Sequence, residues 1–531
     1  MSGRGMSGYS VSPAANRGLL AAIGIIILGY AVAAALHLPQ RGTELIVAGG
    51  MPESAEEGAA SEQASRPRPH GVAQIHPPYW TVGPFVLLLG AIALLPLVPA
   101  TSRWWDSNLH RFYVAGGLAA ITLAYYLLLH ASAIEAHWPA PHLAWPSETG
   151  PNVVQSGEVL ANAILGEYLP FIVLLLSLYT ISGGIRIEGD LPAHPLTNCA
   201  FLAAGALLAS FIGTTGAAML LIRPLLETNR ERKYVQHTVI FFIFIVCNCG
   251  GLLLPLGDPP LFLGYLLGVP FLWTIVLWKQ WLVVNVALLA IYYLWDRFWC
   301  YPRERRADVD RDETRVHRLR FGGLWPNALL LAGVILSVAL LDPGKPIRGT
   351  SWHPWLYLRE VAQLVMVALS LALGSSHARR LNRFNYAAIL EVAALFFGIF
   401  ICMQPALQIL AVEGPNLGLT EPWHYFWASG SLSSVLDNAP TYVVFFQTAA
   451  SLTATAGHHP AIAGVAERLL VAISLGSVFM GANTYIGNGP NFMVKAIAEE
   501  SGVAMPSFFG YLLYSGGILI PLFVLVTFLF L

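Results

Sequence analysis

Two aspartates stand inside apolar stretches of the sequence. Asp437 lies in Ser433–Thr441, which reads SSVLDNAPT, and Asp258 lies in Pro255–Pro260, which reads PLGDPP. An ionisable side chain at the depth of a bilayer costs at least ~2.5–3.5 kcal/mol on insertion scales, so it indicates a functional site. Asp258 precedes two prolines and could equally cap a helix that begins with them. Asp437 has no such local role in the sequence. We predict that it is the coupling carboxylate, the group whose binding of a cation or a proton links the two.

Neutral oxygen donors and glycines accompany the two aspartates in the same short segments. Carboxylate, amide, hydroxyl and carbonyl oxygens are the ligands that hard cations take. We therefore expect an ion- or substrate-binding site in which Asp437 and Asp258 bind sodium. A carboxylate that binds either the cation or a proton would support the exchange of one for the other. The other candidate site residues are Thr214, Thr215, Gly257, Asn438, Thr441, Asn483, Thr484, Gly487 and Asn488.

Four further charged residues have simpler explanations. Glu167 and Glu391 each stand at the expected start of an apolar helix, where a carboxylate interacts favourably with the helix dipole. Arg223 and Lys495 lie just beyond the site segments. They could hold an anion, but interfacial anchoring would also explain them.

Other classes of protein find little support. We can assemble no His/Cys metal cluster, nucleotide-binding loop or Ser/His/Asp set from the membrane region, so we expect no enzymatic activity. Transport would be secondary rather than driven by ATP, with no cofactor beyond the transported Na⁺ and H⁺. The formal net charge of −1 excludes a basic nucleic-acid-binding protein.

The composition defines the fold class. Only 11% of the 531 residues are charged and 56% are hydrophobic, whereas soluble chains have about 25% charged residues. The sequence therefore predicts an all-α polytopic membrane protein that has the lipid bilayer as its partner. A crossing helix needs about 20 apolar residues. Candidate spans are 19–38, 80–100, 114–131, 164–183, 234–256, 275–295, 322–341, 357–374, 387–411, 465–483 and 508–531.

The N-terminal part is expected to contain two units. Residues 1–77 would be a signal anchor or signal peptide at 19–38, followed by a flexible extracytoplasmic segment from residue 39 that is rich in Pro, Glu, Ser and Ala. Residues 78–160 would add extra N-terminal transmembrane helices.

Positive charges indicate which loops face the cytoplasm. Residues 296–320 contain eight arginines and are predicted to be a cytoplasmic linker, whereas 112–185 and 384–467 contain no Lys or Arg. The spans alternate consistently only if 198–222 and 427–448 are re-entrant hairpins that enter from opposite sides. The C-terminus would then be extracytoplasmic.

The two halves carry the same features in the same order. Residues 161–295 would form a first inverted repeat with hairpin 198–222 and broken helix 234–265, and residues 321–531 a second with hairpin 427–448 and broken helix 465–495. Inverted repeats with Gly/Pro-interrupted helices are typical of secondary transporters whose site lies at the membrane midplane. A spacing of 230 residues separates Gly251 from Gly481, Gly257 from Gly487, and Pro260 from Pro490.

These motifs resemble the ion transporter superfamily over roughly residues 160–531. The resemblance rests on Cys249–Gly251 and Pro255–Pro260 in the first half and on Ser434–Thr441 in the second. The group includes sodium:proton antiporters, arsenite exporters, citrate–metal carriers and dicarboxylate carriers. It implies a homodimer in which each protomer has a scaffold and a mobile domain that carries its site across the membrane like an elevator.

Within this superfamily the Leu-Asp-Asn-x-Pro form is similar to the antiporter and arsenite-exporter branches. A carboxylate at the hairpin tip disfavours the dicarboxylate branch, because it would repel a carboxylate substrate. Leu253, Leu254 and Tyr485 depart from the family's pattern in the two breaks, which leaves the number of sodium sites open.

We predict a secondary active transporter of the bacterial cytoplasmic (inner) membrane with a small inorganic ion as substrate. It would exchange sodium, or lithium, for protons by alternating access. The alternative is a citrate-type organic anion carrier coupled to a cation, for which Arg223 or Lys495 would have to reach the substrate.

Overall fold

A computed structural model describes residues 13–49, 76–96, 98–147, 150–314, 317–347, 349–456 and 461–531. Helices dominate these residues, and only three small two-stranded sheets accompany them. The described part contains six helices that are long and apolar enough to cross a membrane, or up to seven if one bent pair counts as a single span. These findings agree with a polytopic membrane protein.

The N-terminal region begins with α1 (Pro13–Ala35) and α2 (Leu38–Gly49). We expected a flexible segment from residue 39, but α2 packs against the 354–356 loop. The Thr43 hydroxyl donates to the Pro354 carbonyl (3.1 Å) and accepts from the Leu356 amide (2.9 Å). The rest of that expected segment, residues 50–75, lies outside the described residues. Next come η2 (Tyr79–Val82), α3 (Gly83–Leu94), α4 (Ser102–Trp105) and α5 (Asn108–Leu128).

One long helix follows strands β1 (Ile134–Ala136) and β2 (His142–Ala144). It consists of α6 (Val153–Ala161), the π-helical turn η3 (Asn162–Tyr168) and α7 (Leu169–Ser182). Our prediction of a span that starts at residue 164, with Glu167 near its N-terminus, is therefore wrong. Glu167 lies in the middle of a helix, where the helix dipole does not explain it.

The first candidate hairpin and broken helix come next. The hairpin consists of α8 (Pro195–Ile212) and α9 (Thr214–Thr228), which meet at Gly213, so it is longer than the 198–222 we expected. The interrupted helix consists of α10 (Gln236–Ile245), η4 (Cys249–Leu252) and α11 (Pro259–Leu266). Then follow η5 (Trp273–Leu277), α12 (Trp278–Trp295), η6 (Asp296–Cys300) and η7 (Tyr301–Arg303).

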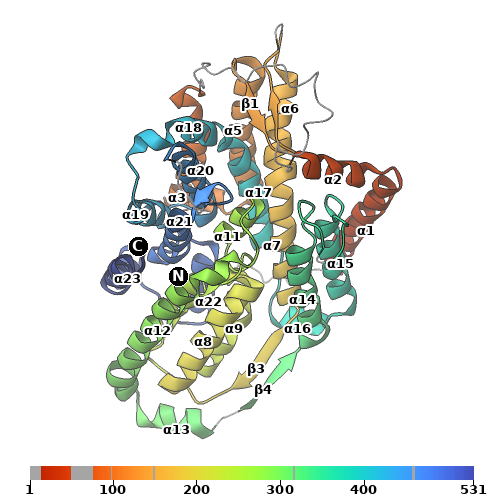
Figure 1. Cartoon of the computed structure of the whole chain (residues 1–531). Helices are drawn as coiled ribbons and strands as arrows, with labels where there is room; N and C mark the ends of the chain where they lie inside the picture. The colour runs from red at the N-terminus through yellow and green to blue at the C-terminus, as the bar shows by residue number, and fades with distance from the viewer. Residues whose placement is uncertain are drawn as a thin grey trace.

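The Arg-rich linker contains regular structure that the all-α expectation misses. It forms α13 (Arg306–Thr314) and most of β4 (His317–Gly322), which pairs antiparallel with β3 (Arg186–Asp190). Arg186 lies opposite Gly322 and Glu188 opposite Arg320. Figure 1 places α13 and this sheet at one end of the molecule, opposite β1 and α18.

The second half begins with α14 (Leu324–Leu340), α15 (Leu358–Leu373) and α16 (Ser376–Leu381). The expected span at 387–411 is bent by 42° between α17 (Ala387–Cys402) and the following helix. Pro405 accounts for the bend, because proline cannot continue a helical hydrogen-bond ladder. That following helix is α18 (Gln404–Glu413), and η8 (Gly414–Leu417) succeeds it.

A second hairpin and interrupted helix complete the chain. The hairpin consists of α19 (Pro422–Ser433) and α20 (Asn438–Ala456), again longer than expected. Strands β5 (Ala461–Ile462) and β6 (Val465–Ala466) lead into α21 (Glu467–Phe479), η9 (Met480–Asn483) and α22 (Gly489–Glu500). The last helix is α23 (Phe508–Phe530).

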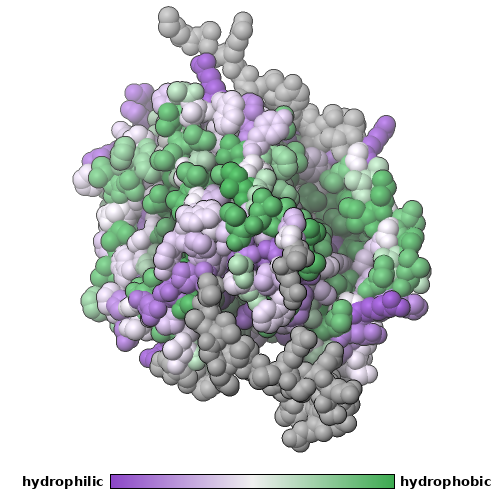
Figure 2. Space-filling view, turned by 90° about the horizontal axis from the view of Figure 1, so that it is seen from above, coloured by the Kyte–Doolittle hydropathy of each residue, from purple (hydrophilic) through white to green (hydrophobic). Residues whose placement is uncertain are grey.

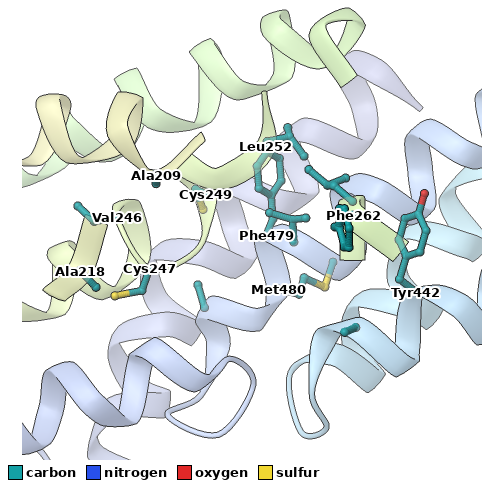
Figure 3. Close-up of a cluster of buried hydrophobic side chains, with 14 of the residues drawn as sticks. Ala209, Ala218, Val246, Cys247, Cys249, Leu252, Phe262, Tyr442, Phe479 and Met480 are labelled. Carbon is teal, nitrogen blue, oxygen red and sulfur yellow. The ribbon is translucent and has the colours of Figure 1, made fainter. Parts of the chain in front are cut away.

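Apolar residues occur on the outside as well as in the core. Phe509, Leu513 and Phe528 on α23 are all largely exposed, and Figure 2 shows several patches of apolar side chains among polar ones on the face that it presents. A soluble monomer seldom exposes so much apolar surface, whereas lipid covers it. Inside, one large core cluster surrounds both interrupted helices. Figure 3 shows Cys249 and Leu252 of the first break in the same cluster as Phe479 and Met480 of the second.

Candidate functional site

The two interrupted helices lie side by side, although they are far apart in the sequence. The Asn488 amide donates to the Asp258 carboxylate (3.2 Å) and to the Cys247 carbonyl (3.0 Å). The Asn248 amide donates to Asn491 Oδ1 (2.8 Å). Each break exposes backbone and polar groups that lipid could not satisfy. These hydrogen bonds satisfy the Cys247 carbonyl and the side chains of Asp258 and Asn248 with groups of the second break.

Asp258 is the centre of the site. It stands at the N-cap of α11, directly before two prolines, but its side chain makes no capping bond. The carboxylate instead accepts from Thr214 Oγ1 (3.2 Å), Asn438 Nδ2 (2.8 Å) and Asn488 Nδ2 (3.2 Å). Thr214 opens α9 and Asn438 opens α20, so both hairpin tips and the second break converge on one carboxylate that is 1% exposed.

Asp437 behaves differently from our expectation. It lies at the tip of the second hairpin, is half-buried, and its Oδ1 accepts from the Ala439 amide (3.1 Å) at the first turn of α20. This is the geometry of a helix N-cap. The statement that Asp437 lacks a local structural role is wrong, and the capping role that we considered for Asp258 belongs to Asp437.

The remaining predicted donors join the second hairpin to the second break. The Asn483 amide donates to Ser434 Oγ (2.9 Å), and the Thr484 hydroxyl donates to the Ser434 carbonyl (2.6 Å). Thr441 donates to the Asp437 carbonyl (3.0 Å) within its own hairpin. Thr215 is half-buried beside Thr214. None of these side chains has a hydrogen bond to Asp258 among the described residues.

Two buried oxygens of the site could receive a cation. Asn438 Oδ1 and Asn483 Oδ1 have no hydrogen-bond partner within the described part of the chain. Buried amide oxygens are nearly always satisfied, so such oxygens need an explanation. Together with the Asp258 carboxylate and the Thr214 hydroxyl they are the chemical types that a hard cation takes.

Glycines allow the backbone to double back in each break. A Cβ on Gly257 would overlap the Gly251 carbonyl oxygen, and one on Gly487 would lie 2.6 Å from the Gly481 carbonyl oxygen. The Thr214 amide donates to the Gly257 carbonyl (2.8 Å), so the first hairpin tip is joined to the first break here. Gly257 and Gly487 therefore shape the site rather than bind a ligand through side chains.

Sequence reasoning missed a serine in each hairpin. Ser210 Oγ donates to the Gly250 carbonyl (2.6 Å) and accepts from the Leu253 amide (3.1 Å). Ser434 Oγ donates to the Met480 carbonyl (3.1 Å) and accepts from Asn483. Ser434 follows Ser210 by 224 residues and Met480 follows Gly250 by 230. The repeat spacing could have identified both serines.

The other charged candidates make no hydrogen bond or ion pair with Asp258 among the described residues. Lys495 pairs with Glu499 (2.8 Å), and Arg223 has no ion pair among the described residues. Glu391 pairs with Arg111 (3.0 Å) near the start of α17, whereas Glu167 pairs with His137 (3.2 Å). The hydrogen-bond partners of Asp258 are therefore all neutral side chains.

A buried His/Asp/Cys group exists that the sequence analysis did not assemble. His237, Asp296 and Cys300 bring potential ligand atoms close together. Both carboxylate oxygens of Asp296 are bound by Arg232, with Nη1 at 2.9 Å from Oδ2. Because the guanidinium already occupies the carboxylate, we interpret this group as a structural ion pair that joins the loop between α9 and α10 to η6, and not as a metal centre.

A family model described as "Putative citrate transport" matches residues 129–531, which is most of the chain. No curated protein matches the sequence. The match begins earlier than the residue 160 at which we placed the start of the resemblance, so it includes β1, β2 and the first part of the long helix. It agrees with the resemblance to the ion transporter superfamily, in which citrate carriers form one group. The chain thus belongs to the family of putative citrate transporters.

Proposed function

We propose that this integral membrane protein carries a citrate-type organic anion together with a cation. The observation that carries the proposal is the charge of the site in combination with the family. Asp258 is surrounded by Thr214, Asn438 and Asn488, all neutral, and Asp437 adds a second carboxylate at the hairpin tip. A bare multivalent anion would be repelled there. A co-bound or chelated cation, held by Asp258 and the free amide oxygens, would neutralise both partners.

Arg223 is our candidate for direct contact with the anion. It lies on α9 of the first hairpin, is half-buried, and is free of ion pairs in the described part of the chain. Lys495 is a weaker candidate because Glu499 already pairs with it. The inverted-repeat and elevator arrangement, the homodimer and the placement of the Arg-rich linker in the cytoplasm remain part of the proposal.

A sodium (or lithium):proton antiporter is the second candidate. It is favoured by one specific observation, the combination of the Asp258 carboxylate with the unpartnered oxygens of Asn438 and Asn483. Such a set could bind a cation without any organic substrate. The family name favours the citrate carrier over this candidate.

One flux experiment separates the two candidates. The purified full chain in lipid vesicles is tested for uptake of labelled citrate with Na⁺, H⁺, Mg²⁺ or Ca²⁺ supplied in turn, and for the collapse of a pH gradient by Na⁺ or Li⁺ without citrate. Citrate uptake that requires a cation, and that is lost on Asp258→Asn and reduced on Arg223→Ala, would support the proposal. A Na⁺ response without citrate uptake would favour the antiporter.

Glu391→Gln is the matched control for the flux experiment. It also neutralises one carboxylate of a membrane helix, but Glu391 pairs with Arg111 away from the site. We expect this variant to transport at a rate close to that of the unmodified protein. If it is as inactive as Asp258→Asn, the loss reflects general damage and the role of Asp258 is not supported.

A further inference from the structure

A buried carboxylate faces a contact between two parts of the membrane region. The long α6–η3–α7 helix and α17 meet α11 and α20 around a cavity of about 40 Å³. We call this contact the seam. It is lined on one side by His137, Glu167 and Phe400, and on the other by Leu263, Leu266 and Val443. Helix α11 begins directly after Asp258 and α20 begins at Asn438, and these two residues meet at the site. The seam therefore lies along the helices that carry the site.

Glu167 is the unusual member of this lining. It is 7% exposed, its Oε1 lies 3.2 Å from His137 Nε2, and its Oε2 has no hydrogen-bond partner among the described residues. A buried carboxylate oxygen without a partner carries a large desolvation cost. The cavity has room for a water-sized ligand beside it.

The fold holds this pair in place. Glu167 belongs to the π-helical turn Asn162–Tyr168, and such turns occur mostly as local bulges at functional sites. The same turn fixes the partner, because Asn162 Oδ1 accepts from the backbone amides of His137 (3.1 Å) and Trp138 (3.0 Å). The imidazole is therefore positioned over the carboxylate by the bulge that presents it.

The chemistry of the lining selects the ligand. A metal ion needs four or more donor atoms, but the other described lining side chains are apolar: Leu263, Leu266, Leu267, Phe400 and Val443. An imidazole nitrogen and a carboxylate oxygen 3.2 Å apart can share one proton. We propose that Glu167 and His137 form a proton-binding site and that the bound proton holds the seam closed.

The direction of the effect follows from charge. With one proton the pair is neutral overall, and the leucines of α11 can pack against it. When that proton is lost, Glu167 keeps a negative charge whose Oε2 faces an apolar wall. This state is unfavourable unless water enters, so the closed seam is stable while the proton is bound and opens when the proton is lost.

Other charged groups near η3 do not supply this switch. Each of the neighbouring carboxylates on α6, α15 and α17 already has a basic partner, and Glu135 of β1 is exposed. Helices α7, α11 and α20 contain no charged residue. Tyr357 donates to the Leu165 carbonyl (3.0 Å). The paired groups are His142–Glu158 (3.5 Å), Arg359–Glu360 (2.6 Å) and Arg111–Glu391 (3.0 Å).

The test measures access to the seam and needs no transport assay. Leu266→Cys is introduced into the full chain in lipid nanodiscs, and its rate of modification by a polar methanethiosulfonate is measured from pH 5.5 to 8.5, with the protein lacking this cysteine as background. The same reporter is measured with Glu167→Gln. Because thiol ionisation affects both backgrounds equally, the ratio of the two rates reports the seam alone.

We expect this ratio to rise with pH, by at most roughly tenfold per pH unit, the limit for one proton lost on opening. His137→Gln should alter this rise, because the carboxylate then has no imidazole with which to share the proton. Glu391→Gln, which alters an Arg-paired carboxylate, should leave the profile unchanged. Leu267→Cys serves as a second reporter if Leu266→Cys does not fold. A ratio that is independent of pH with both reporters would overturn the proposal.

Discussion

The two interrupted helices are built alike but carry different charges. In each break, a pair of glycines allows two segments of backbone to approach each other closely. A serine from the neighbouring hairpin donates to a carbonyl of the break, and an N-cap residue precedes the second half-helix. That N-cap is Asp258 in the first break and Asn488, 230 residues later, in the second. In the structure these two equivalent residues touch each other.

The two breaks therefore share one backbone arrangement, and the difference between Asp258 and Asn488 determines which break carries the negative charge. If both N-caps were aspartates, two buried carboxylates would lie within 3.2 Å, the present separation of Asn488 Nδ2 and Asp258 Oδ1, and repel each other strongly. With one asparagine, the second break donates a hydrogen bond to the carboxylate of the first. The second carboxylate of the region, Asp437, is used at a hairpin tip where it caps a helix.

The largest effect is expected for Asp258→Asn. The variant removes the one charge that Thr214, Asn438 and Asn488 bind. Hydrogen bonds to a charged group are worth about 1.5–3 kcal/mol, so the loss of one such bond should lower cation-coupled uptake by about 10- to 150-fold. Uptake into vesicles measures the loss. The double variant Asp258→Asn/Asn488→Asp moves the carboxylate to the other break; recovery of uptake would mean that either break can supply the charge.

The second-largest effect is expected for substitution of a glycine in either break. We expect Gly257→Ala and Gly487→Ala to lower the free energy of unfolding by about 1–3 kcal/mol, the usual cost of overpacking. Gly257→Ala should lower the free energy of unfolding more than Gly487→Ala, since its Cβ approaches the facing carbonyl oxygen more closely. Thermal unfolding in detergent measures both. Gly489→Ala is the control, because a Cβ there meets nothing within 4 Å; equal stability of all three variants would contradict the comparison.

The substitution Asp437→Asn should reduce transport less than Asp258→Asn does. Asp437→Asn keeps an oxygen for the Ala439 amide, whereas Asp437→Ala loses the cap and should cost about 1 kcal/mol of stability. Unfolding measurements on both variants test this. If Asp437→Asn loses as much transport as Asp258→Asn, Asp437 would instead be the principal ion-binding carboxylate.

The smallest effect concerns the two serines. Ser434→Ala should destabilise more than Ser210→Ala, because the Ser434 hydroxyl hydrogen is shared between the Gly430 (2.8 Å) and Met480 carbonyls, whereas that of Ser210 reaches the Gly250 carbonyl alone. With hydrogen bonds worth about 0.5–1.5 kcal/mol each, we expect a difference of roughly 0.5–1 kcal/mol. The same unfolding assay measures it. A larger loss for Ser210→Ala would show that the first hairpin depends more on its break than the second.

The positions of most helices and of both breaks could be predicted from the sequence, because membrane helices and their interruptions have strong local signals. The apolar runs located most of the helices, and the glycine and proline spacing located both breaks and both aspartates. What the sequence could not reveal is the direction of a side chain. Asp258 and Asp437 both precede a helix, and only the packing of four segments shows that Asp437 caps its helix while Asp258 faces inward.

Other misses have equally physical reasons. The π-helical turn at Glu167 has no signature in apolar periodicity, so a single long helix was predicted to start too late. Helix α2 depends on contacts with residues more than 300 positions away, such as Thr43 with Pro354. The β3–β4 pairing likewise joins Arg186 to Gly322 across the whole first half. Local sequence patterns contain no information on such distant partners.

The small β3–β4 sheet sets a mechanical limit on any motion of the first hairpin. Strand β3 ends at Asp190 and α8 begins at Pro195, while β4 ends at Gly322 and α14 begins at Leu324. Five peptide steps therefore tether the hairpin to the sheet, and a fully extended tether of that length reaches only about 17 Å. If the hairpin travels across the membrane as proposed, its stroke relative to the sheet cannot exceed what this short tether allows.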